Sequence, residues 1–264
     1  MSENKLSILS DVVTPISDAV QQNIPETVSQ TDGVLSTVVG FFNNVVLYPV
    51  KKANLTFRYK LEAFEDDLKD KIKNIPVENL QMPPTMIAGP TLEALRYAYD
   101  EEELRDMYEN LLASSMDSRK ALDAHPAFVD AIKQMSPLDA LILNTLVDLV
   151  QVRCASIKFQ IKNTTSVYTN AMPNYFVEEL SDLSDPFAIS SSLVNLERVA
   201  FIKITENGII GADYKCMETH PYVKSREGLF KNFGKDFDIK IYEHAIIITD
   251  FGKQFAKICL EKEI

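Results

Sequence analysis

The stretch from Gly89 to Leu149 constrains the fold most, because it holds consecutive amphipathic helix patterns that each have a start signal. Apolar residues recur at spacings of three and four in each pattern, which is the period of a helix with one buried face. Pro90, Pro126 and Pro137 each favour a first helical turn, and Asp100 is expected to cap a further helical segment. The predicted helices cover about 90–116, 126–135 and 136–150.

Residues 34–75 are predicted to form one long helix with a kink at Pro49. Its first part, Val34 to Val50, is uncharged and too short to span a membrane, so we weigh burial or a subunit contact against an interfacial membrane segment and favour burial. Its second part is amphipathic, and we expect a homo-oligomer through 34–75. The candidate assembly or membrane residues are Val39, Phe41, Phe42, Val46, Phe57, Leu61, Phe64 and Leu68.

From Ser136 onward the pattern changes to helix, strand, two helices, two strands and a final helix that Thr249 is expected to cap. This order predicts a winged-helix-like domain over 136–264, with a hairpin at Glu206 to Gly208 and an irregular insertion over about 213–238. The fold class is therefore predicted as mainly α, with a helical region over 1–135 and an α+β C-terminal domain.

The helix from Ala188 to Val199 is the candidate recognition helix, but it carries one basic residue. Because DNA readers usually surround base-contacting residues with several phosphate-neutralising cations, we favour a protein contact or a structural role over DNA binding. A net charge of −11 points the same way. The candidate nucleic-acid contacts are Ser191, Ser192, Asn195 and Arg198.

Catalytic signatures are missing from the sequence: it has no glycine-rich phosphate loop, paired CxxC, HExxH or GxSxG. Cys216 and His220 are four residues apart, but two ligands do not make a structural zinc site. We therefore expect a non-enzymatic protein without a metal or cofactor. Three scattered cysteines suit a reducing compartment, so we expect a cytoplasmic protein, with membrane association as the alternative.

A polar cluster after the helix that ends near residue 116 is the best candidate for an interaction surface, although helix termination plus a surface salt bridge accounts for it more simply. Its members are Ser114, Ser115, Asp117, Arg119, Asp123 and His125.

The phrases EEELRDMYENLLASSMDSRK, HPAFVDAIKQMSPLDALIL and SLVNLERVAFI resemble the abortive-infection alpha family of bacteria, a family of unknown function. The resemblance covers the chain from about Val45 to the end. It implies a role in antiviral defence, in which an infected cell stops growing before the phage matures. We expect action through protein interaction and assembly, with a phage or host protein as partner. A winged-helix transcription regulator and a membrane-active effector using residues 34–50 are the alternatives.

Overall fold

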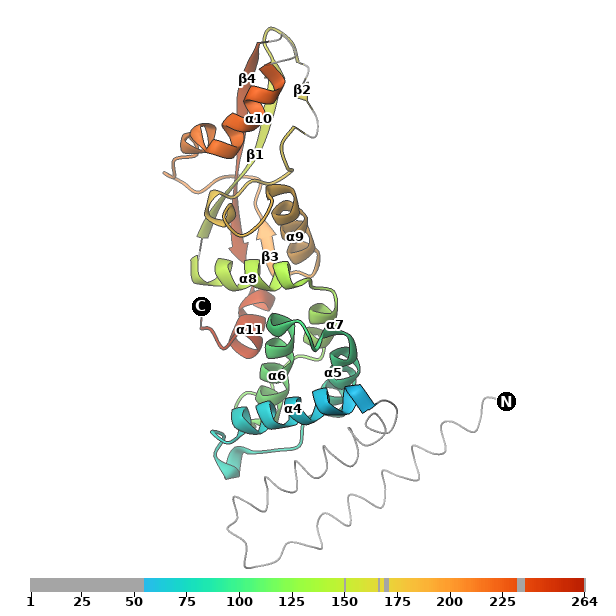
Figure 1. The fold of residues 1–264 in the computed structure, drawn as a ribbon. Helices are drawn as coiled ribbons and strands as arrows, with labels where there is room; N and C mark the ends of the chain where they lie inside the picture. The colour runs from blue at the N-terminus through green and yellow to red at the C-terminus, as the bar shows by residue number, and fades with distance from the viewer. Residues whose placement is uncertain (1–54, 150, 166, 169–170, 232–235, 264) are drawn as a thin grey trace, which may run out of the picture. The chain divides into compact units, whose positions relative to one another are not determined.

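The computed structural model describes residues 55–149, 151–165, 167–168, 171–231 and 236–263 (Figure 1). The protein is mainly helical with a small antiparallel sheet near the C-terminus, which confirms the predicted fold class. Its described residues divide into two compact units, the first comprising 55–92 and 112–122 and the second comprising 93–111 and the described residues from 123 to 263.

The first unit contains α4 (Leu55–Ile72), the short 3₁₀ helix η2 (Val77–Asn79), the start of α5 and the end of α6. Along α4, the side chains of Phe64, Leu68 and Ile72 recur at steps of four and are at most 4% exposed. Their spacing produces the apolar stripe that the sequence predicts for this helix. The part of the predicted 34–75 helix that precedes residue 55 lies outside the described residues.

Helix α5 (Thr85–Ala98) begins five residues earlier than the start predicted at Pro90, so that proline lies inside the helix. The carbonyl of Pro84 accepts hydrogen bonds from the amides of Ile87 and Ala88, both at 2.9 Å, and this builds the first turn ahead of Pro90. The predicted 90–116 segment is interrupted, because α5 ends at Ala98 and α6 (Glu102–Met116) follows. Helix α6 begins at Glu102, two residues after the predicted cap at Asp100.

Helices α7 (Ala127–Lys133) and α8 (Pro137–Leu149) begin where the sequence predicts. At the start of α8, the Ser136 amide donates to Asp139 Oδ2 at 2.7 Å and the Asp139 amide donates to Ser136 Oγ at 3.1 Å. This reciprocal pair is a capping box, which satisfies two amide groups that the helix itself cannot satisfy.

The sheet contains β1 (Gln151–Ile161), β2 (Val167–Tyr168), β3 (Ile202–Ile204) and β4 (Phe237–Ile248) in the order β2-β1-β4-β3, with all pairs antiparallel. Helix α9 (Pro186–Arg198) connects toward β3, and α11 (Asp250–Cys259) follows β4. The long β1–β4 pair is buried on different faces at its two ends. Val152 and Cys154 are buried on one face near the base, whereas Ile157 and Phe159 are buried on the other face near the tip.

The predicted hairpin at residues 206–208 is wrong, and the insertion predicted as irregular contains the 3₁₀ helix η4 (Lys215–Thr219) and α10 (Pro221–Lys231). Among the described glycines only Gly211 has a positive φ, so Gly208 does not form the expected tight turn. Gly208 instead permits a close approach to β4, because a Cβ at that position would lie 2.8 Å from Glu243 Cβ.

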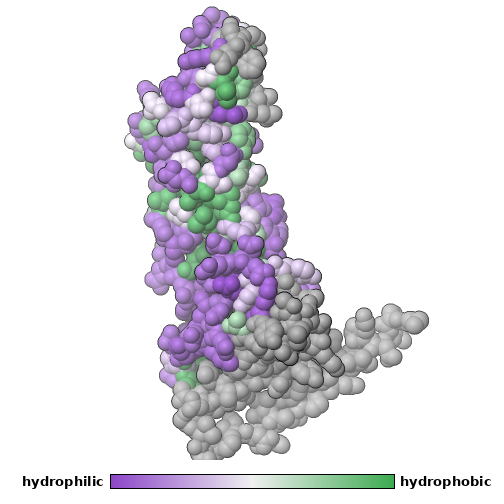
Figure 2. All heavy atoms as spheres, in the orientation of Figure 1, coloured by the Kyte–Doolittle hydropathy of each residue, from purple (hydrophilic) through white to green (hydrophobic). Residues whose placement is uncertain are grey.

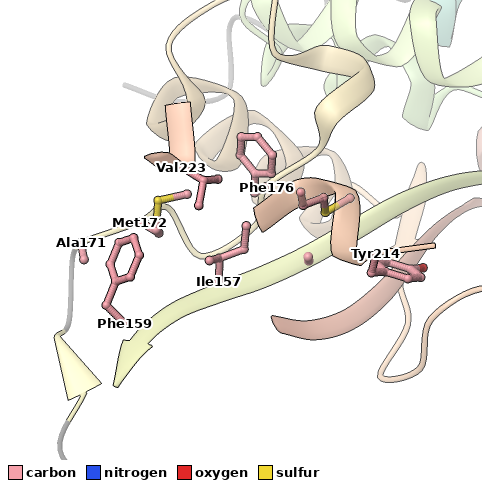
Figure 3. Close-up of a cluster of buried hydrophobic side chains, with 9 residues drawn as sticks. Ile157, Phe159, Ala171, Met172, Phe176, Tyr214 and Val223 are labelled. Carbon is pink, nitrogen blue, oxygen red and sulfur yellow. The ribbon is translucent and has the colours of Figure 1, made fainter. Parts of the chain in front are cut away.

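Helix α10 and η4 cover the tip of the β1–β4 pair and bury a second hydrophobic core there (Figure 3). Ile157 and Phe159 from β1 meet Phe176, Met217 and Val223 in this core. Phe176 does not lie in the first of the two helices predicted after the strand, because that α-helix does not form. It instead exchanges backbone hydrogen bonds of 2.8 and 2.9 Å with Ala155, and only the 3₁₀ helix η3 (Glu178–Leu180) forms nearby.

An aromatic core joins α7 to α11 within the second unit. The ring of Phe128 on α7 lies 5.2 Å from that of Phe255 on α11, which in turn lies 4.1 Å from Phe201. Thr249 Oγ1 caps α11 by accepting from the Gly252 amide at 2.9 Å, as predicted. Gly252 brings α11 close to the preceding chain, since a Cβ there would lie 2.1 Å from the Phe201 carbonyl oxygen.

Candidate functional site

The first four residues of the predicted polar cluster lie in the first unit, in a turn that we call the Asp117 turn (Ser114 to Arg119). The Asp117 carboxylate is buried, and it accepts hydrogen bonds from Arg119 Nη2 at 2.6 Å, from Nε at 2.8 Å and from the Arg119 amide at 3.0 Å. The Arg119 side-chain hydrogen bond is the main reason that the pKa of Asp117 is lowered. Ser115 is fully buried and its hydroxyl donates to the Leu112 carbonyl at 2.7 Å.

The Asp117 turn is also fixed by backbone contacts with the segment after η2. The Ser118 amide donates to the Asn79 carbonyl and the Gln81 amide donates to the Met116 carbonyl, both at 2.8 Å. The polar groups of the turn are therefore engaged in closing the end of α6, and the exposed part is mainly the guanidinium of Arg119.

Asp123 and His125, the other two members of the predicted cluster, belong to the second unit and have partners there. The Asp123 carboxylate accepts from Lys257 Nζ on α11 at 2.6 Å. His125 Nδ1 accepts from the Ala127 amide at 3.1 Å, and the imidazole lies 6.0 Å from the Phe251 ring. These two side chains hold the start of α7 and the outer side of α11.

The predicted nucleic-acid contacts lie on α9, but the structure directs two of the four, Ser192 and Asn195, inward. Ser192 is 6% exposed. The Asn195 amide nitrogen donates to the Gln134 carbonyl at 2.8 Å and to Asp139 Oδ2 at 2.9 Å. These bonds tie α9 to the start of α8, so Asn195 is engaged within the fold.

Arg198, the one basic residue of α9, belongs to the same hydrogen-bond network as Asn195 and Gln134. Its Nη1 donates to Gln134 Oε1 at 2.7 Å and its Nη2 donates to Asn195 Oδ1 at 2.7 Å. Ser191 is exposed and is the predicted contact residue that faces away from these bonds. A phosphate would therefore have to compete with protein oxygens for the only cation on the helix.

One side of α9 exposes Phe187, Ser191, Val194 and Arg198, and we call its first three residues the α9 outer face. These residues are spaced by four and three, so they share one side of the helix. Phe187 is 38% exposed and Val194 is 45% exposed, while the guanidinium of Arg226 lies 5.7 Å from the Phe187 ring. Exposed uncharged side chains of this kind suit contact with another apolar surface rather than with phosphates.

Helix α8 packs against α9 and also leaves apolar side chains exposed. Leu141 is 37% exposed and Leu149 is 40% exposed, and Figure 2 shows hydrophobic side chains gathered at the level of α8 amid a largely hydrophilic surface. The two helices thus carry four of the exposed large apolar side chains of the second unit: Leu141, Leu149, Phe187 and Val194.

Two polar groupings were not predicted from the sequence, because each depends on strand register. His244 on β4 lies with Nδ1 2.8 Å from the Thr205 carbonyl oxygen and with Nε2 3.2 Å from Ser156 Oγ on β1. The Ser156 hydroxyl donates to the Asn174 carbonyl at 2.7 Å, so its proton is not available to the imidazole. The group resembles a nucleophile–base pair only in its distances. Its hydrogen bonds link β1 and β4 to the chain at Asn174 and Thr205.

The second unpredicted grouping includes Cys216. From the sequence, Cys216 was of interest only as a metal ligand, and with His220 alone it does not make a zinc site. Arg153 Nη1 lies 3.1 Å from Cys216 Sγ, and its Nη2 lies 3.2 Å from Glu178 Oε2. The His220 ring packs 5.1 Å from that of Phe176. Within the part of the chain that the structure describes, no group of three or more His, Cys, Asp or Glu residues is placed to hold a metal ion.

The structure describes the side chains of two of the eight predicted assembly residues, Phe64 and Leu68. Val39, Phe41, Phe42 and Val46 lie outside the described residues, as do the side chains of Phe57 and Leu61 on α4. Phe64 and Leu68 are buried in the first unit. Over the described residues, no helix combines the length and the apolar character that crossing a bilayer requires.

The fold defines the class of the protein, mainly helical with a small antiparallel sheet. The model of the abortive infection alpha family matches residues 56–259. The chain therefore belongs to the abortive infection alpha family, which confirms the resemblance noted in the sequence and points to an antiphage role of the abortive-infection type. No curated protein matches the chain, and no solved structure does.

Proposed function

We propose that this protein is a non-enzymatic antiphage protein that acts by binding another protein, a phage or host component, through the α9 outer face. Membership of the abortive infection alpha family supports the antiphage role. The observation that carries the mode of action is the orientation of α9: Asn195 and Arg198 are bonded to the α7–α8 connection, and Phe187 and Val194 are exposed.

We infer that residues 136–264 form a winged-helix-like domain, because α8, β1, α9, β3 and β4 follow in that order and β4 lies between β1 and β3. A winged-helix regulator would present α9 to the major groove and surround it with cations. Helix α9 supports a protein contact better, since its one arginine is bonded to Gln134, and the apolar Phe187 and Val194 on the same side of the helix are exposed.

We further propose that the protein assembles into a homo-oligomer through residues 34–75, as the uncharged apolar sequence of 34–50 suggests. Light scattering should give a mass above that of the 29.8 kDa monomer. A deletion of residues 1–50 should return the particle to the monomer mass, and a monomeric full-length protein would end this part of the proposal. Flotation of the full chain with liposomes would instead support the membrane-active alternative.

Phage plating tests the proposed role. Bacteria expressing the protein should form fewer plaques than bacteria with the empty vector for at least some phages of a broad panel, and infected cells should stop growing before phage is released. Equal plating across the whole panel would contradict the antiphage role. Duplex DNA binding that weakens steeply with salt would contradict the protein-contact mode and favour a regulator.

A further inference from the structure

A cavity of about 420 Å³ opens in the second unit, between the end of α5, the start of α6 and the end of α7 (helices labelled in Figure 1). Its floor is apolar and includes Leu104, Ile132 and Met135, each at most 6% exposed. Cavities that bind small molecules in proteins are commonly of this size, roughly 300–1,000 Å³, with an apolar lining and a few polar groups. No residue of the α9 outer face lines it, so the cavity is independent of the proposed protein contact.

Tyr108 on α6 lines the cavity and supplies a buried polar atom. The side chain has no exposed surface, and its hydroxyl has no hydrogen-bond partner among the described residues. Burial, with smaller contributions from Asp130 and Cys259, raises the pKa of Tyr108, so the hydroxyl stays protonated and can donate a hydrogen bond. Buried polar groups in native proteins are nearly always satisfied, so an unsatisfied one calls for a partner from outside the chain.

The rim of the cavity favours a positively charged ligand. Glu93, Tyr97 and Glu101 line it at spacings of four residues, and all three are exposed, Tyr97 by 82%. Two carboxylates beside an aromatic ring attract an organic cation through charge and through the ring face. The one cation of the lining, Lys133, has its ammonium 3.7 Å from Asp130, which offsets part of its repulsion.

We propose that this cavity binds a small organic amine with an apolar body and a hydrogen-bond acceptor. The ammonium lies at Glu93 and Glu101, the apolar body covers Leu104 and Ile132, and the acceptor takes the hydrogen bond of Tyr108. The Tyr108 oxygen is covered in the structure, so binding includes the movement of a wall side chain that uncovers it. The limited volume favours a small molecule over a protein segment.

Three probes of similar size test the proposal by calorimetry on the full chain: 4-methoxyphenethylamine, phenethylamine and 4-methoxyphenylacetate. The first should bind with a dissociation constant of about 1 mM or tighter, as expected for a ligand of roughly a dozen heavy atoms. Phenethylamine, which lacks the acceptor, should bind several-fold more weakly, and the anion should not bind. Equal binding of the amine and the anion, or no binding of either amine, would overturn the proposal.

Matched variants test separately the role of the two rim acids and the role of the Tyr108 hydroxyl. Exchanging both rim acids, as Glu93→Gln with Glu101→Gln, should weaken amine binding by about tenfold, whereas Glu102→Gln, an exposed acid outside the lining, should leave it unchanged. Tyr108→Phe should remove the preference for the methoxy compound and should not lower the melting temperature of the unliganded protein, because it removes an unsatisfied hydroxyl. A preserved preference in Tyr108→Phe, or loss of binding in Glu102→Gln alone, would contradict the assignment.

Discussion

The Asp117 turn and helix α9 carry similar polar sequences, but the structure uses them differently. In the turn, a buried carboxylate is satisfied by an arginine two residues away, so the interaction is local. On α9, Asn195 reaches residues 56 and 61 positions earlier in the chain and leaves the apolar Phe187 and Val194 exposed. The difference teaches that polar residues of a candidate site are available to a partner only where the fold does not already engage them.

Asp139→Ala should show the largest effect on stability, because it breaks the tie between α8 and α9. The substitution leaves the amides of Ser136 and Asn195 without their partner and removes a helix cap, so we expect a loss of about 2–3 kcal/mol. Urea unfolding followed by circular dichroism measures it. Asp182→Ala, an exposed acid of the same unit, is the control with little expected change. A loss no greater than that of the control would show that the tie is unimportant.

Asp117→Asn should have a smaller effect that depends on pH. The pKa of Asp117 is lowered in the folded protein, so the pair stabilises the fold above the unfolded pKa of about 3.9, and this contribution is lost as pH falls through the folded value. At pH 7 we expect Asn to cost about 1–2 kcal/mol, because one carboxylate oxygen becomes an NH2 group that cannot accept from Arg119 and the bonds to the other oxygen lose their charge.

Below about pH 4 the difference between wild type and Asp117→Asn should shrink, because the unfolded chain takes up a proton on Asp117 that the folded protein takes up only at a lower pH. Denaturant midpoints at pH 7 and pH 3 measure this, with the exposed Asp70→Asn as a control. A difference that grows on acidification would contradict the geometry of the turn.

Arg198→Ala should have the smallest effect, within about 0.5–1 kcal/mol, because the arginine is exposed and bonded to surface groups. An electrophoretic mobility-shift assay with duplex DNA tests whether Arg198 is available to a phosphate. We expect no measurable binding by wild type or variant at physiological salt. Wild-type binding that Arg198→Ala removes would instead mean that this cation is available to phosphate.

Most helix starts could be predicted because their signals are local. Asp185 caps α9 by accepting from the Phe187 amide at 2.9 Å, and Ser136 with Asp139 caps α8. Helix α10 and the tip core could not be predicted, since Phe159, Phe176 and Val223 meet only after β1 and β4 have paired. For the same reason the sequence placed Asn195 on the correct helix but could not show that its side chain faces inward.

The central claim is that the α9 outer face makes a protein contact needed for antiphage action. Plating efficiency on cells expressing Val194→Glu tests it most directly, with Ile210→Glu as the matched control, because Ile210 is fully exposed in the same unit but lies outside α9. At equal soluble protein levels and equal melting temperature, Val194→Glu should restore plaque formation by about tenfold or more, since a charge in an apolar contact is costly to desolvate. Ile210→Glu should protect as the wild type does. Full protection by Val194→Glu would contradict the account.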